Sequence, residues 1–188
     1  MTEKPTQLLQ LHISLLDIDP PIWRRLIVPD NLSFAQLGQV LLIAMGWECY
    51  HLYEFRVGKC TISDPENNYG DDDNFHDQHT TLLHQIIDGR QKKFRLWYDF
   101  GDDWWHEIRI EKHLPDDGLG VRLLEGENAC PPEDCGGVPG YFRLLDIFAD
   151  RKHPEYKEMH EWLGRIFDPI QFHLKKTQKA IAACMKQS

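Results

Sequence analysis

The chain has 188 residues, of which 41% are hydrophobic and 11% aromatic, so it is long enough to bury one sizeable core. Its formal net charge of −9 argues against a general nucleic-acid coat, because phosphate binding needs a basic surface. No secretory signal is visible, and no apolar run approaches the ~20 residues of a membrane helix. We therefore expect a soluble, cytoplasmic protein without a membrane partner, whose five cysteines are reduced thiols.

The N-terminal part of the sequence predicts a hairpin followed by a helix. Apolar and polar residues alternate over 8–15, which is typical of a half-buried strand, and 22–28 reads as its partner after a proline turn. Residues 34–45 have helical spacing. Ser33 and Gln36 fit a capping box, and Gly46 fits the position just after the helix.

The next part predicts short strands around a long acidic loop. Residues 51–57 read as a strand and 60–62 as its partner. Residues 63–79 carry acids, Pro, Asn and Gly but no Lys or Arg, which predicts a loop of unusual length. A short helix is expected over 81–87, capped by Thr80 or Thr81.

Residues 92–112 predict a second hairpin. A three-residue loop at 101–103 would pair Phe100 with Trp104 and Tyr98 with His106, and every apolar position would then meet an apolar or aromatic partner. The glycine and the aspartates at the tip fit turn chemistry.

The C-terminal part predicts one more strand and then helices. Residues 121–126 read as the strand, and 130–140 are too rich in Pro and Gly for a regular element. Helical spacing follows from 141 to 148, again after Pro154, and in a last segment that begins near 168 and ends at about 184. We expect one α+β domain over 1–188, with an antiparallel or mixed sheet (6–128) packed against helices and a helical C-terminal third (138–186).

Two segments carry a resemblance to a known family. YDFGDDWWHEIRIEK (98–112) and ACPPEDCGGVPGY (129–141) resemble signatures of the plasmid pRiA4b Orf3-like family, which includes insertion-element passenger proteins labelled TnpR. The segments 22–47 and 167–174 also resemble that family in order and spacing. The resemblance implies an α+β fold and an intracellular protein, sometimes encoded on mobile elements, with no established catalytic residues. One departure is the pair Trp104-Trp105, where the family commonly has one tryptophan before a polar residue.

The acidic tip of the second hairpin has two interpretations. Carboxylates and an imidazole could hold a divalent ion for a metal-dependent hydrolase or nuclease, with Glu133 and Asp134 nearby. The ligands of that alternative would be Asp99, Asp102, Asp103 and His106. In the expected register Asp99 points away from His106, which favours a capped turn, and we expect no metal or cofactor.

Three other features each leave an alternative open. Cys130 and Cys135 lie at the edge of zinc-ligand spacing, but the chain has no second paired motif, so a rigid loop is favoured. Trp97 and Trp105 are either an exposed aromatic platform or a second core layer under the C-terminal helices. The last helix presents four lysines that could contact DNA or form a solvated face: Lys175, Lys176, Lys179 and Lys186.

No pair of nucleophile and base is evident, so the sequence favours a non-enzymatic accessory or binding module. We expect an unidentified protein partner, with nucleic acid as the weaker alternative. The binding surface would combine the hairpin tip, the 63–79 loop and the 130–140 loop. Its candidate residues are Asp99, Asp102, Asp103, Trp105, His106, Glu133 and Asp134.

Overall fold

The first hairpin forms where the sequence predicts it. A computed structural model describes residues 6–67 and 73–186 of the chain. Strand β1 (Gln7–Leu15) pairs antiparallel with β2 (Trp23–Pro29). One face of β1 is buried because its alternating apolar residues all point into the core: Leu9, Leu11, Ile13 and Leu15.

Helix α1 (Phe34–Met45) also begins and ends as expected. The Ser33 side chain accepts a hydrogen bond from the Gln36 backbone, and the Gln36 side chain accepts one from the Ser33 backbone, which completes the capping box. Gly46 ends the helix with a positive φ and donates its N–H to the Leu42 carbonyl.

The segment that follows contains more regular structure than its composition suggests. Strands β3 (Tyr53–Val57) and β4 (Cys60–Ser63) pair as predicted, and a 3₁₀ turn follows (Pro65–Asn67). The expected 63–79 loop also holds a short strand, β5 (Phe75–Asp77), which pairs parallel with β4. Helix α2 (Leu83–Ile86) starts later than predicted: neither threonine caps it, and its first turn is closed by the Gln85 side chain, which accepts from the Leu82 N–H.

Three more strands complete the sheet: β6 (Lys93–Tyr98), β7 (Trp104–Pro115) and β8 (Arg122–Glu127). Within the described residues, eight strands form one mixed sheet in the order β5-β4-β3-β6-β7-β1-β2-β8. Among the described strand pairs, β4–β5 alone is parallel, so the sheet is antiparallel over the strands that carry the core.

The predicted register of the second hairpin is wrong by two residues. Tyr98 pairs with Trp104 and Leu96 with His106, so the turn spans five residues, 99–103. A shift of two keeps every side chain on its expected face, which is why the apolar pattern alone could not distinguish the two registers. The longer turn is favoured because Asp99 adopts a left-handed conformation and begins it.

The C-terminal part holds three helices, α3 (Gly137–Ala149), α4 (Tyr156–Leu163) and α5 (Leu174–Cys184). Helix α3 starts inside the Gly-rich stretch that was expected to be irregular to 140, and α5 starts later than the predicted 168. No residue of α4 is fully buried. Of its expected inward residues, Tyr156, Met159 and Leu163 are half-buried, with the Tyr156 ring against Phe148 of α3, whereas Trp162 is exposed. Irregular segments at 150–155 and 164–173 separate the three helices.

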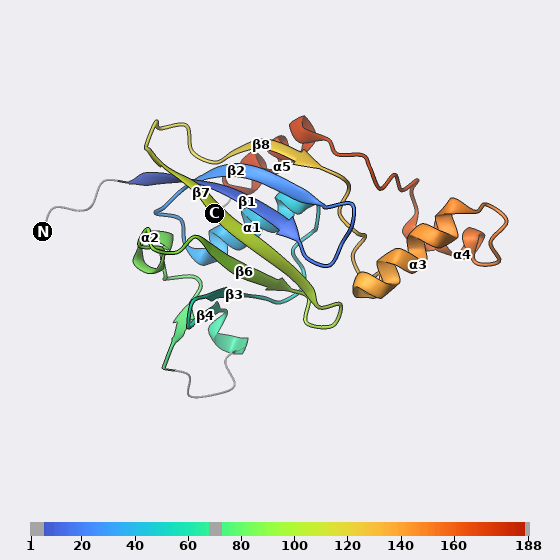
Figure 1. Ribbon diagram of the computed structural model, residues 1–188, viewed down its shortest axis with the longest axis horizontal. Helices are drawn as coiled ribbons and strands as arrows, with labels where there is room; N and C mark the ends of the chain where they lie inside the picture. The colour runs from blue at the N-terminus through green and yellow to red at the C-terminus, as the bar shows by residue number, and fades with distance from the viewer. Residues whose placement is uncertain (1–5, 68–72, 187–188) are drawn as a thin grey trace, which may run out of the picture.

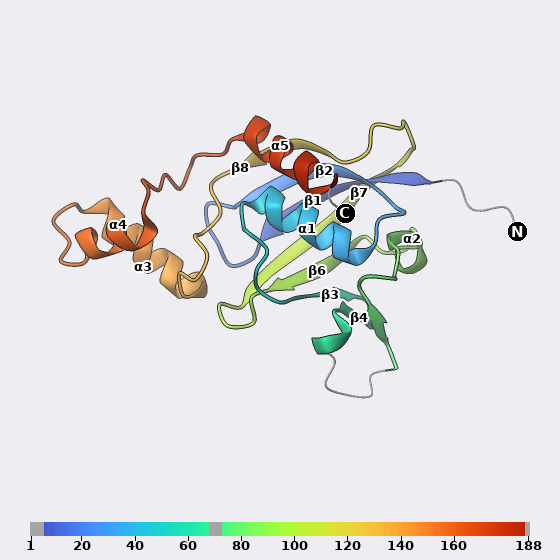
Figure 2. The ribbon, with the colours of Figure 1, turned by 180° about the vertical axis from the view of Figure 1, so that it is seen from behind.

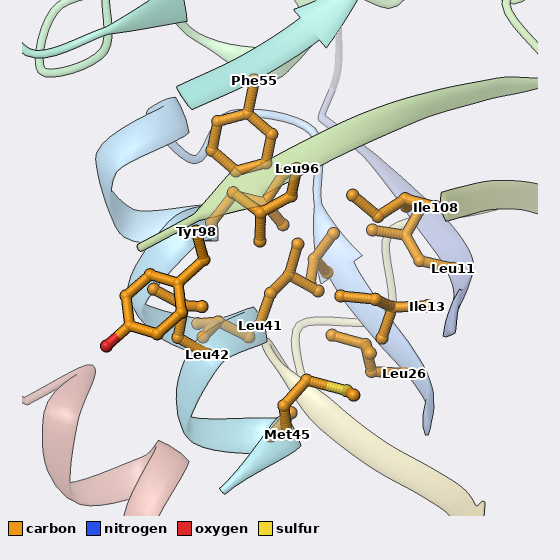
Figure 3. Close-up of a cluster of buried hydrophobic side chains, with 14 of the residues drawn as sticks. Leu11, Ile13, Leu26, Leu41, Leu42, Met45, Phe55, Leu96, Tyr98 and Ile108 are labelled. Carbon is orange, nitrogen blue, oxygen red and sulfur yellow. The ribbon is translucent and has the colours of Figure 1, made fainter. Parts of the chain in front are cut away.

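The molecule is a single α+β domain in which helices cover one face of the sheet. Figures 1 and 2 show α1 and α5 on that face, and α3 with α4 beyond the end of the sheet where the β6–β7 turn lies. Side chains of α1 meet those of β1, β2, β3, β6 and β7 in the core (Figure 3). In the described part of the chain, no helix lies on the opposite face of the sheet.

None of the helices in residues 6–67 and 73–186 combines the length and the hydrophobicity that a membrane span needs.

Candidate functional site

Three segments that are distant in the sequence meet at the tip of the second hairpin. They are the 47–51 segment after α1, the turn 99–103, and the loop 129–136 before α3. The Trp47 indole donates to the Pro131 carbonyl (2.9 Å), and the Glu48 N–H donates to the Glu133 carboxylate (2.9 Å). The Gly136 N–H donates to Asp102 Oδ2 (3.0 Å), which fastens the loop to the turn. The prediction that Glu133 and Asp134 approach the hairpin tip therefore agrees with the geometry.

Asp99 organises the turn. Its φ of 52° is left-handed, and its Oδ1 accepts hydrogen bonds from the backbone N–H groups of Gly101 (3.0 Å) and Asp102 (3.3 Å). The Asp103 N–H donates to the Asp99 carbonyl at 2.7 Å. The predicted capping of turn amides by aspartate is thus present, and it uses only one of the two carboxylate oxygens of Asp99.

The second oxygen of Asp99 faces an imidazole. His51 Nε2 lies 3.5 Å from Asp99 Oδ2 and 3.0 Å from Asp134 Oδ1. The other oxygen of Asp134 accepts a hydrogen bond from the Tyr50 hydroxyl (2.6 Å). In the described residues, His51, Asp99 and Asp134 form a group whose possible ligand atoms all lie within 4.8 Å of one another, close enough to share one ion.

Glu133 lies on the inner side of this group. Tyr98 sits at the edge of the core with its hydroxyl directed outwards (Figure 3), and it donates to Glu133 Oε1 at 3.0 Å. Burial raises the pKa of the Glu133 carboxyl, and burial together with the charge of Glu133 raises the pKa of the Tyr98 phenol. The raised pKa of the phenol keeps the Tyr98 proton in place as the donor.

His106 does not join this site, so the alternative metal set of Asp99, Asp102, Asp103 and His106 is not assembled. His106 is fully buried on the core face of β7, where its Nδ1 lies 3.3 Å from the Leu96 carbonyl and its ring meets the edge of Trp47. The alternation along β7 puts His106 beside the core residue Trp104, whereas Asp99 and Asp102 belong to the turn.

Burial makes His106 a determinant of acid stability. Loss of hydration lowers its pKa to about 4, from an unfolded value near 6.5, so the folded state holds the neutral ring. Between these two values only the unfolded chain takes up the proton. Stability should therefore fall as the pH drops from 6.5 to 4, by up to about 1.4 kcal/mol per pH unit. Urea unfolding of wild type and His106→Phe across this range measures the effect, and equal slopes for the two proteins would contradict it.

Asp103 and Trp105 point to the opposite, open face of the sheet. The Trp97 and Trp105 rings stack at 5.0 Å with an interplanar angle of 8°, and Phe100 lies 4.3 Å from Trp97. The Trp105 indole donates to Asp103 Oδ1 at 2.9 Å. The alternative in which C-terminal helices cover these tryptophans is wrong, because α3, α4 and α5 all lie elsewhere (Figures 1 and 2).

The remaining candidates lie apart from the hairpin tip. In the 63–79 segment, of which 68–72 lie outside the described residues, the Gln78 carbonyl accepts from the Ala35 N–H at the start of α1. Gln78 therefore lies at the far end of the helix from Trp47. Cys130 and Cys135 are free thiols and do not belong to the ion-sized group of described residues. The four lysines that are expected to be solvated or to bind DNA are exposed: Lys175, Lys176 and Lys179 in α5, and Lys186 just after it.

The sequence patterns do not identify His51 and Tyr50 as site residues, because the 51–57 pattern indicates a strand and nothing marks Tyr50. The one available signal is their position shortly after the C-terminus of a capped helix, where a chain leaves the core and reaches the surface. Nothing in the sequence connects this segment to residues 99 and 134.

The comparisons with known proteins agree with the resemblance seen in the sequence. The model of the family described as "Plasmid pRiA4b ORF-3-like protein" matches residues 7–176. The "Uncharacterized protein y4hQ" of Sinorhizobium fredii (strain NBRC 101917 / NGR234) is 36% identical over 174 residues, which cover 92% of this chain and 89% of that protein.

A solved structure also matches, the crystal structure of the protein of unknown function MM3350 from Methanosarcina mazei Go1. The TM-score is 0.80 at 34% identity, and the match covers 92% of this chain and 98% of that one. The link to insertion elements stays a prediction. The chain belongs to the plasmid pRiA4b ORF-3-like family, whose matched members here are uncharacterised or of unknown function.

Proposed function

We propose that this chain is a non-enzymatic recognition module that binds a protein partner through the open face of its sheet, next to the hairpin tip. The observation that carries the proposal is the aromatic group of Trp97, Phe100 and Trp105, which the hydrogen bond from Trp105 to Asp103 holds in place. Phe100 is 38% exposed although it is a large apolar side chain. Rigid aromatic side chains at a surface are the residues that dominate protein–protein contacts.

The charges around this aromatic group favour a protein over a nucleic acid. Glu107 lies between Lys93 and Arg109, with 2.7 Å to each cation. Arg25 is likewise paired with Glu111 and Glu125 on the same face. Because acids neutralise the cations of this face, it offers no excess of positive charge to phosphates. Arg95, whose guanidinium lies 5.9 Å from the Trp105 ring, adds a residue type that is common at protein interfaces.

Removing the aromatic group should therefore abolish partner binding without unfolding the protein. Trp105→Ala and Asp103→Ala should each weaken binding, the first by roughly 30-fold or more, because a central interface tryptophan contributes about 2 kcal/mol or more. Trp162→Ala is the matched control, since Trp162 is 47% exposed on α4, away from this face. Quantitative affinity purification from cells that naturally produce the protein compares the three variants with wild type.

The informative readout is a partner that wild type and Trp162→Ala retain and that Trp105→Ala loses. Circular dichroism confirms that each variant is folded. If folded Trp105→Ala and Asp103→Ala keep every partner that wild type keeps, the open face is not the binding surface and the proposal fails.

A further inference from the structure

The group of His51, Asp99 and Asp134 lies on the other side of the hairpin tip from Trp105, and the recognition proposal does not use it. Each of its side chains comes from a different segment: the residues after α1, the turn 99–103, and the loop before α3. Their ligand atoms converge to within 4.8 Å of one another. In the described residues, the other close pair of histidine and aspartate, His79 and Asp64, is more exposed and has no third ligand.

The carboxylates of Asp99 and Asp134 are each held by hydrogen bonds to one oxygen, so that the other oxygen is available as a ligand. In Asp99, the turn amides of Gly101 and Asp102 occupy Oδ1, and Oδ2 faces His51. In Asp134, the Tyr50 hydroxyl occupies Oδ2, and Oδ1 faces His51. Outer partners that orient ligating carboxylates in this way are a regular part of metal sites.

One polar atom directed at the centre of this group, His51 Nε2, is buried without a hydrogen bond. The Asp99 side chain beside it is 10% exposed, and its Oδ2 lies 3.5 Å from that nitrogen. His51 Nε2 is buried and makes no hydrogen bond, although Asp134 Oδ1 lies only 3.0 Å away. Ligands of one ion point at the ion and not at one another. A buried polar atom that lacks a partner calls for an explanation such as an ion.

We propose that His51, Asp99 and Asp134 bind one divalent transition-metal ion of the zinc type. One imidazole nitrogen and two carboxylate oxygens suit Zn²⁺ and similar ions, whereas Ca²⁺ and Mg²⁺ prefer more oxygen ligands. Three protein ligands leave at least one position for water or for a group of a partner. Such an ion would tie together three segments that the hydrogen bonds described above already bring into contact. The site is independent of the aromatic face, so either proposal can fail alone.

For the test, the untagged full chain is purified and its metal is removed with a chelator, which is then washed out. The metal-free protein is titrated with ZnCl₂ in the presence of a chromophoric chelator that competes for the ion. Wild type should bind one Zn²⁺ per chain and melt at a higher temperature with zinc than without. His51→Ala should lose at least 100-fold in affinity together with the thermal shift. Asp134→Asn should weaken binding too, and because the Asp134 side chain is 57% exposed, this variant keeps the test valid if His51→Ala fails to fold.

His79→Ala is the matched control, since it removes a histidine that lies 3.0 Å from an aspartate elsewhere on the surface. It should bind zinc like wild type, and MgCl₂ or CaCl₂ should produce no thermal shift in any variant. The proposal is overturned if wild type binds no zinc, or if folded Asp134→Asn and His51→Ala bind it as tightly as wild type. It is also overturned if Cys135→Ser abolishes binding while His51→Ala does not, because the ligands would then be thiols.

Discussion

Replacing Arg24 with methionine is expected to destabilise the fold by about 3–5 kcal/mol. Arg24 is 1% exposed, and its guanidinium stacks on the Phe172 ring at 3.9 Å. All its hydrogen bonds go to backbone carbonyls, two at the C-terminus of α1 and three at the adjoining ends of β2 and β8. The acceptors are Ala44, Met45, Trp23, Glu127 and Asn128.

The loss of stability is expected to be large because methionine replaces the shape of arginine but not its hydrogen bonds or its charge. It fills the space of the aliphatic stem, but the five carbonyls lose their donor, and the last turn of α1, which has no basic residue of its own, loses the cation at its negative end. Arg25→Met is the matched control. Arg25 lies on the open face, paired with partly exposed glutamates, so its loss should cost about 1 kcal/mol or less. Urea unfolding measures both variants, and similar losses would show that Arg24 does not have this role.

Gly137→Ala should cost about 2–4 kcal/mol and detach the 129–136 loop from the hairpin tip. Gly137 has a φ of 68°, which penalises any residue with a Cβ. A Cβ there would lie 2.4 Å from the Asp102 carbonyl oxygen, which is backbone and cannot turn aside. The same approach lets Asp102 accept from Gly136, so the substitution should also break that hydrogen bond.

Gly118→Ala separates the cost of the left-handed backbone conformation from the cost of the clash with the Asp102 carbonyl. Gly118 has nearly the same φ, 72°, but no atom lies within 4 Å of the position of its Cβ. It should therefore cost only the conformational part, about 1 kcal/mol. Thermal or urea unfolding of the two variants gives the difference, which reports the close contact between loop and turn. Equal losses would mean that Gly137 is required only for its backbone conformation.

Local patterns were enough to predict most elements of the fold. Alternation identified β1, and the capping box of Ser33 with Gln36 located α1, because both signals depend on neighbours within a few residues. The predicted register of the second hairpin is wrong because it, too, depends on the local apolar pattern alone. Registers that differ by two give the same faces, and the choice was made by the turn at Asp99.

The candidate site could be predicted only in part, because it is built from long-range contacts. Asp99, Asp102, Glu133 and Asp134 were chosen for their residue types, and the structure brings them together. His51 joins them from a segment about 50 residues before the turn, and no periodicity encodes that approach. His106 was included because it is close in sequence, but strand alternation turns it into the core.

Photo-cross-linking at Phe100 tests most directly whether the open face is the recognition surface. A photoreactive phenylalanine analogue replaces either Phe100, beside Trp97, or Phe142 on α3, and each native side chain is 38% exposed. In cells that naturally produce the protein, position 100 should give a discrete cross-linked species that disappears when Trp105→Ala is combined with it, whereas position 142 should give none. A species that forms equally at both positions, or one at position 100 that persists with Trp105→Ala, would contradict the proposed function.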